Sequence, residues 1–103
     1  LSEHQVKTVL YQGLLALEHI HANGVIHRDI KPANILVKAT QPFVTALADF
    51  GLASTSGEKI FKSHCGTPAY CAPEIYDELC GSGSSADRSC WSAVDIWSMA
   101  VVA

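Results

Sequence analysis

The most informative part of this sequence is residues 27–34, which read His27-Arg28-Asp29-Ile30-Lys31-Pro32-Ala33-Asn34. Four residues separate the carboxylate of Asp29 from the amide of Asn34. Short apolar runs flank this stretch at 25–26 and 35–37, and a third run covers 45–48 behind a proline-containing turn. Apolar and β-branched runs bounded by turn signals predict short strands around loops.

An amphipathic helix is predicted upstream of this stretch. Ser2 followed three residues later by Gln5 is a capping-box pattern, which is typical of a helix N-terminus. The apolar residues that follow recur at steps of three and four and therefore share one helix face: Val6, Val9, Leu10, Leu14, Leu17 and Ile20. Asn23-Gly24 tolerates the left-handed backbone of a helix C-terminus, so we expect the helix to end near Ala22.

The second half of the sequence has less regular patterning. From Asp49 to Glu74 there is no sustained hydrophobic period, and Gly, Ser, Thr and Pro are frequent. This composition predicts a long loop, which is uncommon in a compact domain unless the loop has a function. Residues 81–85, Gly-Ser-Gly-Ser-Ser, predict a flexible insertion. Residues 93–103 are so uniformly apolar that we expect a helix at the centre of a larger core.

Composition narrows the classes of protein to which the chain can belong. It has 103 residues, of which 49% are hydrophobic and 17% charged, and its formal net charge is -3. The length predicts one compact unit, and apolar content this high excludes a disordered tail. Lysine and arginine do not cluster, so we expect neither nucleic acid nor a membrane as a partner.

The cysteines and the first residue add two further expectations. Cysteines stand at positions 65, 71, 80 and 90, and no two have the two-residue separation of a zinc knuckle. Their even number allows a disulfide framework by count alone. The chain starts at Leu1 and its only methionine is Met99, so we expect it to be a piece of a longer protein.

Three motifs, in the same order, resemble eukaryotic protein kinases of the serine/threonine type: residues 27–34, Asp49-Phe50-Gly51 and Ala72-Pro73-Glu74. The resemblance covers nearly the whole chain. It implies a mainly α-helical α+β fold with short β-strands, which would be part of the larger, C-terminal lobe of a kinase domain. Residues 1–103 would then supply a helix, the catalytic loop, the metal loop, the activation segment and the start of the central helix.

The resemblance also implies a reaction and roles for individual side chains. The longer protein would transfer the γ-phosphoryl group of ATP to serine or threonine hydroxyls of protein substrates. Asp29 would accept or orient the proton of the substrate hydroxyl, while Asn34 and Asp49 would bind the Mg²⁺ that bridges the ATP phosphates. Lys31 would place its ammonium group against the transferring phosphoryl group, and the Thr67 hydroxyl would bridge Asp29 and Lys31.

Other residues resemble binding, regulatory and structural positions of the same family. Leu36 would form the floor under the adenine ring. Arg28 would pair with a phosphate added by an upstream kinase to Ser63, for which Ser54, Thr55 and Ser56 are rival acceptors. Asp95 would accept hydrogen bonds from the backbone of His27 and Arg28, and a lone aspartate among apolar neighbours needs such donors. His27 and Phe50 would link the catalytic loop to the metal loop.

Two alternatives to an active kinase remain. The glycine-rich phosphate loop, the strand lysine and its helix glutamate are absent from these 103 residues, so we expect the isolated chain to be inactive. The full-length protein could be a pseudokinase scaffold, against which the intact polar residues weigh, or a non-catalytic interaction module that uses its loops and cysteines. Singly, Asp29, Asn34 and Asp49 could also be ordinary turn and cap residues.

ATP chemistry favours an intracellular location, cytoplasmic and/or nuclear, where thiols stay reduced.

Overall fold

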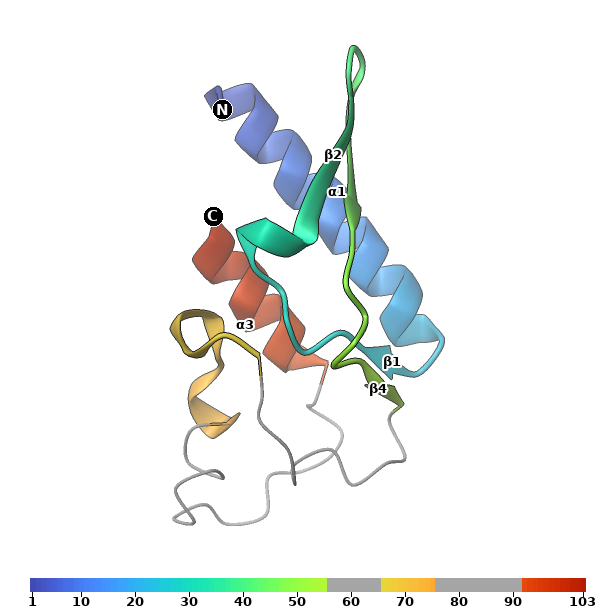
Figure 1. Ribbon diagram of the computed structural model, residues 1–103, viewed down its shortest axis with the longest axis vertical. Coiled ribbons are helices and arrows are strands. Elements are labelled where there is room, and N and C mark those ends of the chain that lie inside the picture. Colours follow the sequence, from blue (N-terminus) through green and yellow to red (C-terminus); the bar gives the residue numbers. More distant parts are fainter. Residues whose placement is uncertain (56–65, 76–91) are drawn as a thin grey trace.

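The computed structural model describes residues 1–55, 66–75 and 92–103. Within these ranges helices combine with short antiparallel strands, so the expected α+β arrangement is confirmed (Figure 1). The elements are, in chain order, α1 (Glu3–Ala22), β1 (Val25–Ile26), the 3₁₀ turn η1 (Pro32–Asn34), β2 (Ile35–Thr40), β3 (Phe43–Leu47), β4 (Ser54–Thr55), the 3₁₀ turn η2 (Pro68–Tyr70) and α3 (Ala93–Val102). Among the described residues, no helix is both long and apolar enough to cross a membrane.

Helix α1 has the ends that the sequence predicts. The Gln5 backbone N–H donates to Ser2 Oγ at 3.1 Å, and the Ser2 backbone N–H donates to Gln5 Oε1 at 2.8 Å. This reciprocal capping box satisfies two amide groups that the first turn leaves without helical partners. At the other end Gly24 has a φ of 72°, the left-handed conformation that only glycine adopts at little cost.

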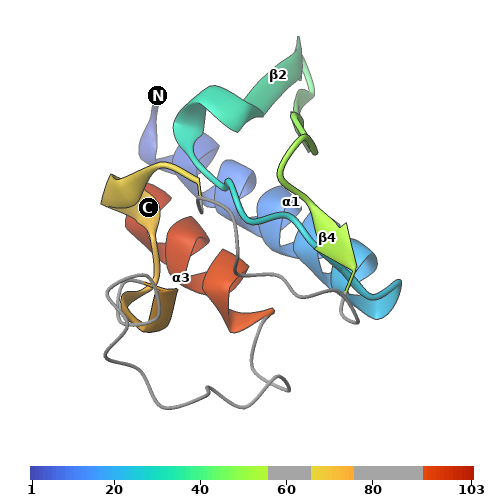
Figure 2. The same ribbon diagram turned by 60° about the horizontal axis from the view of Figure 1, so that its bottom comes forward.

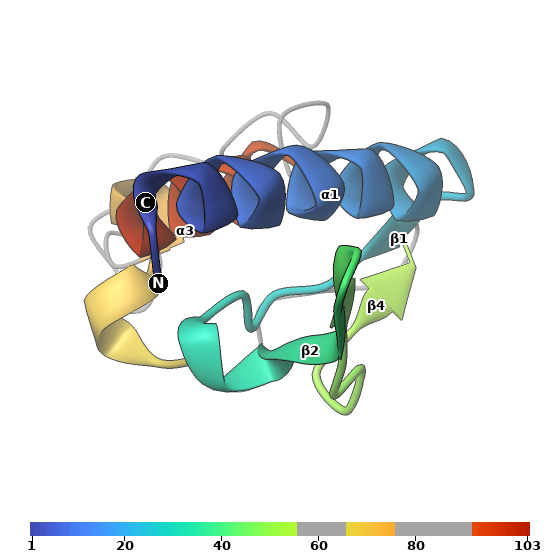
Figure 3. The same cartoon turned by 90° about the horizontal axis from the view of Figure 1, so that it is seen from above.

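The core lies where α1 crosses α3. Leu17, Ile30 and Met99 are almost completely buried and pack together. The helices approach closely at Gly13, where an added Cβ atom would lie 2.6 Å from Cε of Met99. Figure 3 shows α1 passing both α3 and the strands, so this helix connects the two parts of the fold.

Two antiparallel strand pairs, β1–β4 and β2–β3, flank the loops that contain Asp29 and Asp49. Strands β2 and β3 form an antiparallel hairpin that runs from the pair Ile35 and Leu47 to the pair Thr40 and Phe43. Gln12 of α1 holds this hairpin, because its Oε1 accepts from the Thr45 backbone N–H at 2.7 Å and its Nε2 donates to the Phe43 carbonyl at 3.1 Å. The hairpin is longer than its apolar runs suggest, since backbone pairing continues through polar positions.

Strand β4 was not anticipated, because it lies inside the region that the sequence predicts to be loop. Its residues Ser54 and Thr55 pair antiparallel with Ile26 and Val25 of β1. A strand of two residues has no period to detect, so its partner rather than its own sequence defines it. The pair places the segment after Asp49 beside the start of the predicted catalytic loop, residues 27–34.

Helix α3 has one packed face and one open face. Val94, Asp95, Ser98 and Met99 are buried, whereas the Trp97 side chain is 48% exposed. The packed face also contacts η2, as Figure 2 shows. The expected flexible insertion at 81–85 lies outside the described residues.

Candidate active site

A buried carboxylate of α3 holds the backbone of the predicted catalytic loop. Asp95 is fully buried, and its two oxygens accept from the backbone N–H groups of His27 and Arg28, both at 2.8 Å. The sequence-based expectation for Asp95 is therefore confirmed. Arg28 has a φ of 71°, which is uncommon for a residue other than glycine, and the bond from its N–H to Asp95 helps to hold that conformation.

His21 is a further partner of this carboxylate that sequence reasoning missed. Its Nε2 lies 2.7 Å from Oδ2 of Asp95, and its side chain is only 15% exposed. With this contact Asp95 has three hydrogen-bond partners, which offsets the cost of burying a carboxylate. In the sequence, the only signal for His21 is its position in the last turn of α1.

His27 connects the catalytic loop to the predicted metal loop. The Asp29 backbone N–H donates to Nδ1 of His27 at 3.2 Å, so Nδ1 is the acceptor and the ring proton is on Nε2. Nε2 can then donate to the Ala48 carbonyl, 2.9 Å away. The ring also contacts Phe50 at a centroid distance of 4.7 Å. These contacts join the residues on either side of Asp49 to the loop that carries Asp29.

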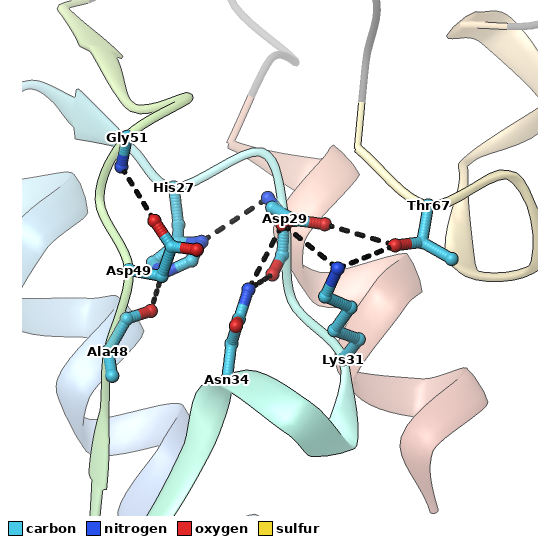
Figure 4. A network of polar contacts seen from close by, with 8 residues as sticks. All are labelled: His27, Asp29, Lys31, Asn34, Ala48, Asp49, Gly51 and Thr67. Carbon is cyan, nitrogen blue, oxygen red and sulfur yellow. Dashed lines mark hydrogen bonds and ion pairs between the residues drawn. The ribbon is translucent and has the colours of Figure 1, made fainter.

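Three side chains that the sequence singles out, Asn34, Lys31 and Thr67, lie around Asp29 (Figure 4). Nδ2 of Asn34 donates to the Asp29 carbonyl at 2.8 Å and to Oδ2 at 3.0 Å. Nζ of Lys31 lies 3.3 Å from the same oxygen and donates to Oγ1 of Thr67 at 2.9 Å. The Thr67 hydroxyl donates in turn to Oδ1 of Asp29 at 3.4 Å. The bridge expected between Asp29 and Lys31 is thus formed, and every oxygen of the carboxylate has a donor.

Gly66 allows Thr67 to approach this cluster. Its φ is 25°, and a Cβ atom there would lie 2.6 Å from the Arg28 carbonyl oxygen and 3.0 Å from Oδ1 of Asp29. Both distances are too short for a side chain, so only glycine lets the two backbones pack this closely. The packing partners of this glycine could not be read from the sequence, because Arg28 and Asp29 lie far from it along the chain.

Asp49 lies on the other side of Asp29 from Thr67 (Figure 4). It is exposed, has a φ of 57°, and accepts from the Gly51 backbone N–H through Oδ1 at 3.2 Å. Its second oxygen has no protein partner in the described part of the chain. Asn34 uses its Nδ2 toward Asp29, which leaves its Oδ1 available.

These oxygens fit Mg²⁺, a hard cation that is commonly bound by one or two protein oxygens together with phosphates. Within residues 1–55, 66–75 and 92–103, no group of three or more His, Cys, Asp or Glu side chains could hold a metal ion. Asn34 and Asp49 would therefore supply only part of the coordination of such a cation, with waters or phosphate oxygens as the other ligands.

Three other predicted residues lie outside the polar cluster. Leu36 is 48% exposed on β2 and takes no part in it. Nη1 of Arg28 is 3.5 Å from the Leu52 carbonyl, and Ser63 lies outside the described residues, so the pairing expected between Arg28 and a phosphate is untested. Of the rival acceptors, Ser54 is only 8% exposed, which makes its hydroxyl a poor substrate in this conformation.

Comparison with known proteins finds relatives that are protein kinases. Residues 1–103 match the family model described as protein kinase domain. The chain is 37% identical over 102 residues to a probable myosin light chain kinase of Dictyostelium discoideum, an alignment that covers 98% of the chain and 31% of the relative. It is 42% identical over 93 residues to the serine/threonine-protein kinase RAD53 of Saccharomyces cerevisiae, which covers 85% of the chain and 11% of the relative. Human serine/threonine-protein kinase D2 is 39% identical over 104 residues, with 99% and 11% covered. The chain thus spans about a third or less of these relatives.

Proposed function

The chain belongs to the protein kinase family, and we propose that it is part of the larger lobe of an active serine/threonine kinase. The full-length protein would transfer the γ-phosphoryl group of ATP to serine or threonine hydroxyls of protein substrates. The observation that carries this proposal is the cluster in which Asn34, Lys31 and Thr67 all contact Asp29, with Asp49 close by. Family membership and the serine/threonine kinases among the relatives support it.

The proposed roles follow from the contacts of each group. Asp29 is held by donors on both oxygens, which orients the carboxylate toward a substrate hydroxyl whose proton it would accept. Lys31 supplies a positive charge beside this carboxylate, where it would offset the charge of the transferring phosphoryl group. Asn34 and Asp49 would hold Mg²⁺, which neutralises phosphate charge when bound.

A pseudokinase scaffold would have no use for this arrangement. All four polar groups that the reaction needs, Asp29, Lys31, Asn34 and Asp49, are present, and three of them are in direct contact. The Thr67 hydroxyl bridges Lys31 and Asp29, so a further side chain helps to hold the Asp29 carboxylate in place. These contacts favour catalysis over a scaffold role.

Further parts of the proposal concern binding and regulation. Leu36 would support the adenine ring, and its exposed position on β2 leaves one face free for a ligand. Ser63 would be phosphorylated by an upstream kinase and would pair with Arg28. Mass-spectrometric mapping of the active protein and the activity of Ser63→Ala test this role, and full activity of that variant would remove Ser63 from it. An intracellular location, in the cytoplasm or nucleus, belongs to the same proposal.

The test is phosphoryl transfer from γ-labelled ATP with Mg²⁺ to peptides that carry serine, threonine or tyrosine, using the full-length protein. We expect labelling of serine and threonine peptides. A nucleotide-dependent thermal shift without transfer would favour the pseudokinase alternative. The absence of both would favour a non-catalytic interaction module.

A further inference from the structure

Ser98 of α3 has a buried hydroxyl that the proposed reaction does not use. The residue is 6% exposed, and its Oγ lies 2.6 Å from the Tyr70 carbonyl oxygen and 3.1 Å from that of Val94. A hydroxyl has one proton to donate. Bonding to the carbonyl four residues earlier is what a serine within a helix does by default. The shorter distance to Tyr70 indicates that the main bond leaves the helix and holds another segment.

That segment is residues 66–71, and its first residues are tied to the candidate active site. Thr67 contacts both Lys31 and Asp29, and the Gly66 backbone packs against Asp29. At the end of η2 the Tyr70 carbonyl accepts a hydrogen bond from Ser98. The segment is therefore anchored at both ends, at one end by the catalytic cluster and at the other by α3.

The second anchor of α3 lies three residues earlier. Asp95 and Ser98 are on the same face of the helix, because residues three apart are neighbours on a helix surface. Asp95 holds the backbone of the catalytic loop, and Ser98 holds the segment that borders it. One rigid turn of helix thus sets the position of these two pieces of chain relative to each other.

The segment 66–71 borders a different side of Asp29 from the proposed nucleotide-binding residues. Asn34 and Asp49, the proposed nucleotide and metal side, lie on one side of Asp29, and Thr67 lies on the other (Figure 4). A substrate hydroxyl must reach Asp29 without displacing the nucleotide, so the acceptor peptide has to pass near residues 66–71. Loosening this segment would disturb the acceptor more than ATP.

We propose that Ser98 is a positioning residue that sets the hold of the kinase on its protein substrate by anchoring the Tyr70 carbonyl to α3. This inference rests on the proposed function, since it assigns the acceptor side of that same site. Ser98→Ala removes only the hydroxyl and adds a strong helix former, so the fold is expected to persist. Ser98→Thr keeps a hydroxyl and should restore the anchor.

The experiment uses the full-length protein and compares Ser98→Ala, Ser98→Thr and the control Ser92→Ala. Ser92 lies at the start of the same helix and its side chain forms no capping hydrogen bond. For Ser98→Ala we expect KM for a serine peptide to rise about threefold to tenfold, the range that one neutral hydrogen bond supports. KM for ATP should stay within about twofold, and both other variants should resemble the unsubstituted protein.

Amide hydrogen exchange provides a readout that does not depend on activity. In Ser98→Ala, residues 66–75 should exchange faster while residues 25–35, anchored by Asp95, stay unchanged. An unchanged peptide KM, or equal changes in the KM values for peptide and ATP, would overturn the positioning role. If the unsubstituted protein transfers no phosphate, the proposed function fails, and unchanged exchange of 66–75 would then overturn the anchor as well.

Discussion

At the scale of single residues, the candidate site depends on backbone conformations that few side chains tolerate. Arg28 and Asp49 both have positive φ values, 71° and 57°. Arg28 directly precedes Asp29, and Asp49 is itself a proposed ligand of Mg²⁺. Residues other than glycine adopt this region rarely, and they do so where surrounding contacts stabilise it. Here the bonds from Arg28 to Asp95 and from Gly51 to Asp49 are such contacts.

Gly66→Ala should damage activity more than stability. The new Cβ atom would lie 2.6 Å from the Arg28 carbonyl oxygen and 3.0 Å from Oδ1 of Asp29, so the two segments must separate. Overpacking of this kind costs about 1–3 kcal/mol, and a shift of about 1 Å at a reacting group can cost roughly a hundredfold in rate. Measuring kcat and the thermal midpoint of the full-length protein checks both parts. Normal kcat would mean that the close packing is unimportant.

Thr67→Val tests the hydroxyl bridge with little change of shape. Valine cannot accept from Lys31 or donate to Asp29, so we expect phosphoryl transfer to fall roughly tenfold or more through lost positioning. Thr67→Ser keeps the hydroxyl and is the matched control, with activity close to that of the unsubstituted protein. Equal rates for the valine and serine variants would contradict the bridging role.

At the scale of elements, the close crossing of α1 and α3 explains a glycine in the middle of a long helix. Gly13→Leu places a large side chain against the end of the Met99 side chain, which is 1% exposed and would have to shift within the core. We expect the free energy of unfolding to fall by about 1–3 kcal/mol, measured by urea denaturation. The control Ala22→Leu adds the same side chain at an exposed position of α1 and should change stability by less than about 0.5 kcal/mol. Similar effects of both substitutions would argue against a packed crossing.

The elements also show what a sequence can and cannot predict. Both ends of α1 were predictable, because the capping box and Asn23-Gly24 act within a few residues. Asp29, Asn34 and Asp49 were singled out by the resemblance of their motifs to protein kinases rather than by local structure. Strand β4 and the bonds of Ser98 and His21 were not predictable, since each depends on a partner many residues away. Local patterns determine local structure, whereas these contacts exist only after the chain has folded.

At the scale of the whole molecule, the proposed reaction needs more than this chain supplies. The cluster around Asp29 is formed, but the glycine-rich phosphate loop that the resemblance implies does not occur in the 103 residues. Helix α3 has an open face on which Ile96, Trp97 and Val101 are each nearly half exposed. Large apolar side chains gathered in this way commonly mark a contact surface.

The isolated 103-residue chain should therefore show no ATP-dependent phosphorylation of a generic basic peptide. The glycine-rich phosphate loop and strand lysine that the resemblance implies are absent from it, so ATP would not be held in line with the acceptor. The full-length protein, assayed in parallel, is the control. Clear phosphorylation by the purified 103-residue chain would contradict this expectation.

The central claim is that Asp29 serves phosphoryl transfer, and one measurement tests it most directly. The initial rate of transfer from ATP to a serine peptide is compared for the full-length protein, for Asp29→Asn, and for Glu18→Gln, which neutralises an exposed carboxylate on α1. We expect Asp29→Asn to lose more than about tenfold in rate, since a positioned acid or base usually contributes far more, while Glu18→Gln keeps the full rate. An Asp29→Asn rate above about a tenth of the unsubstituted value would contradict the account.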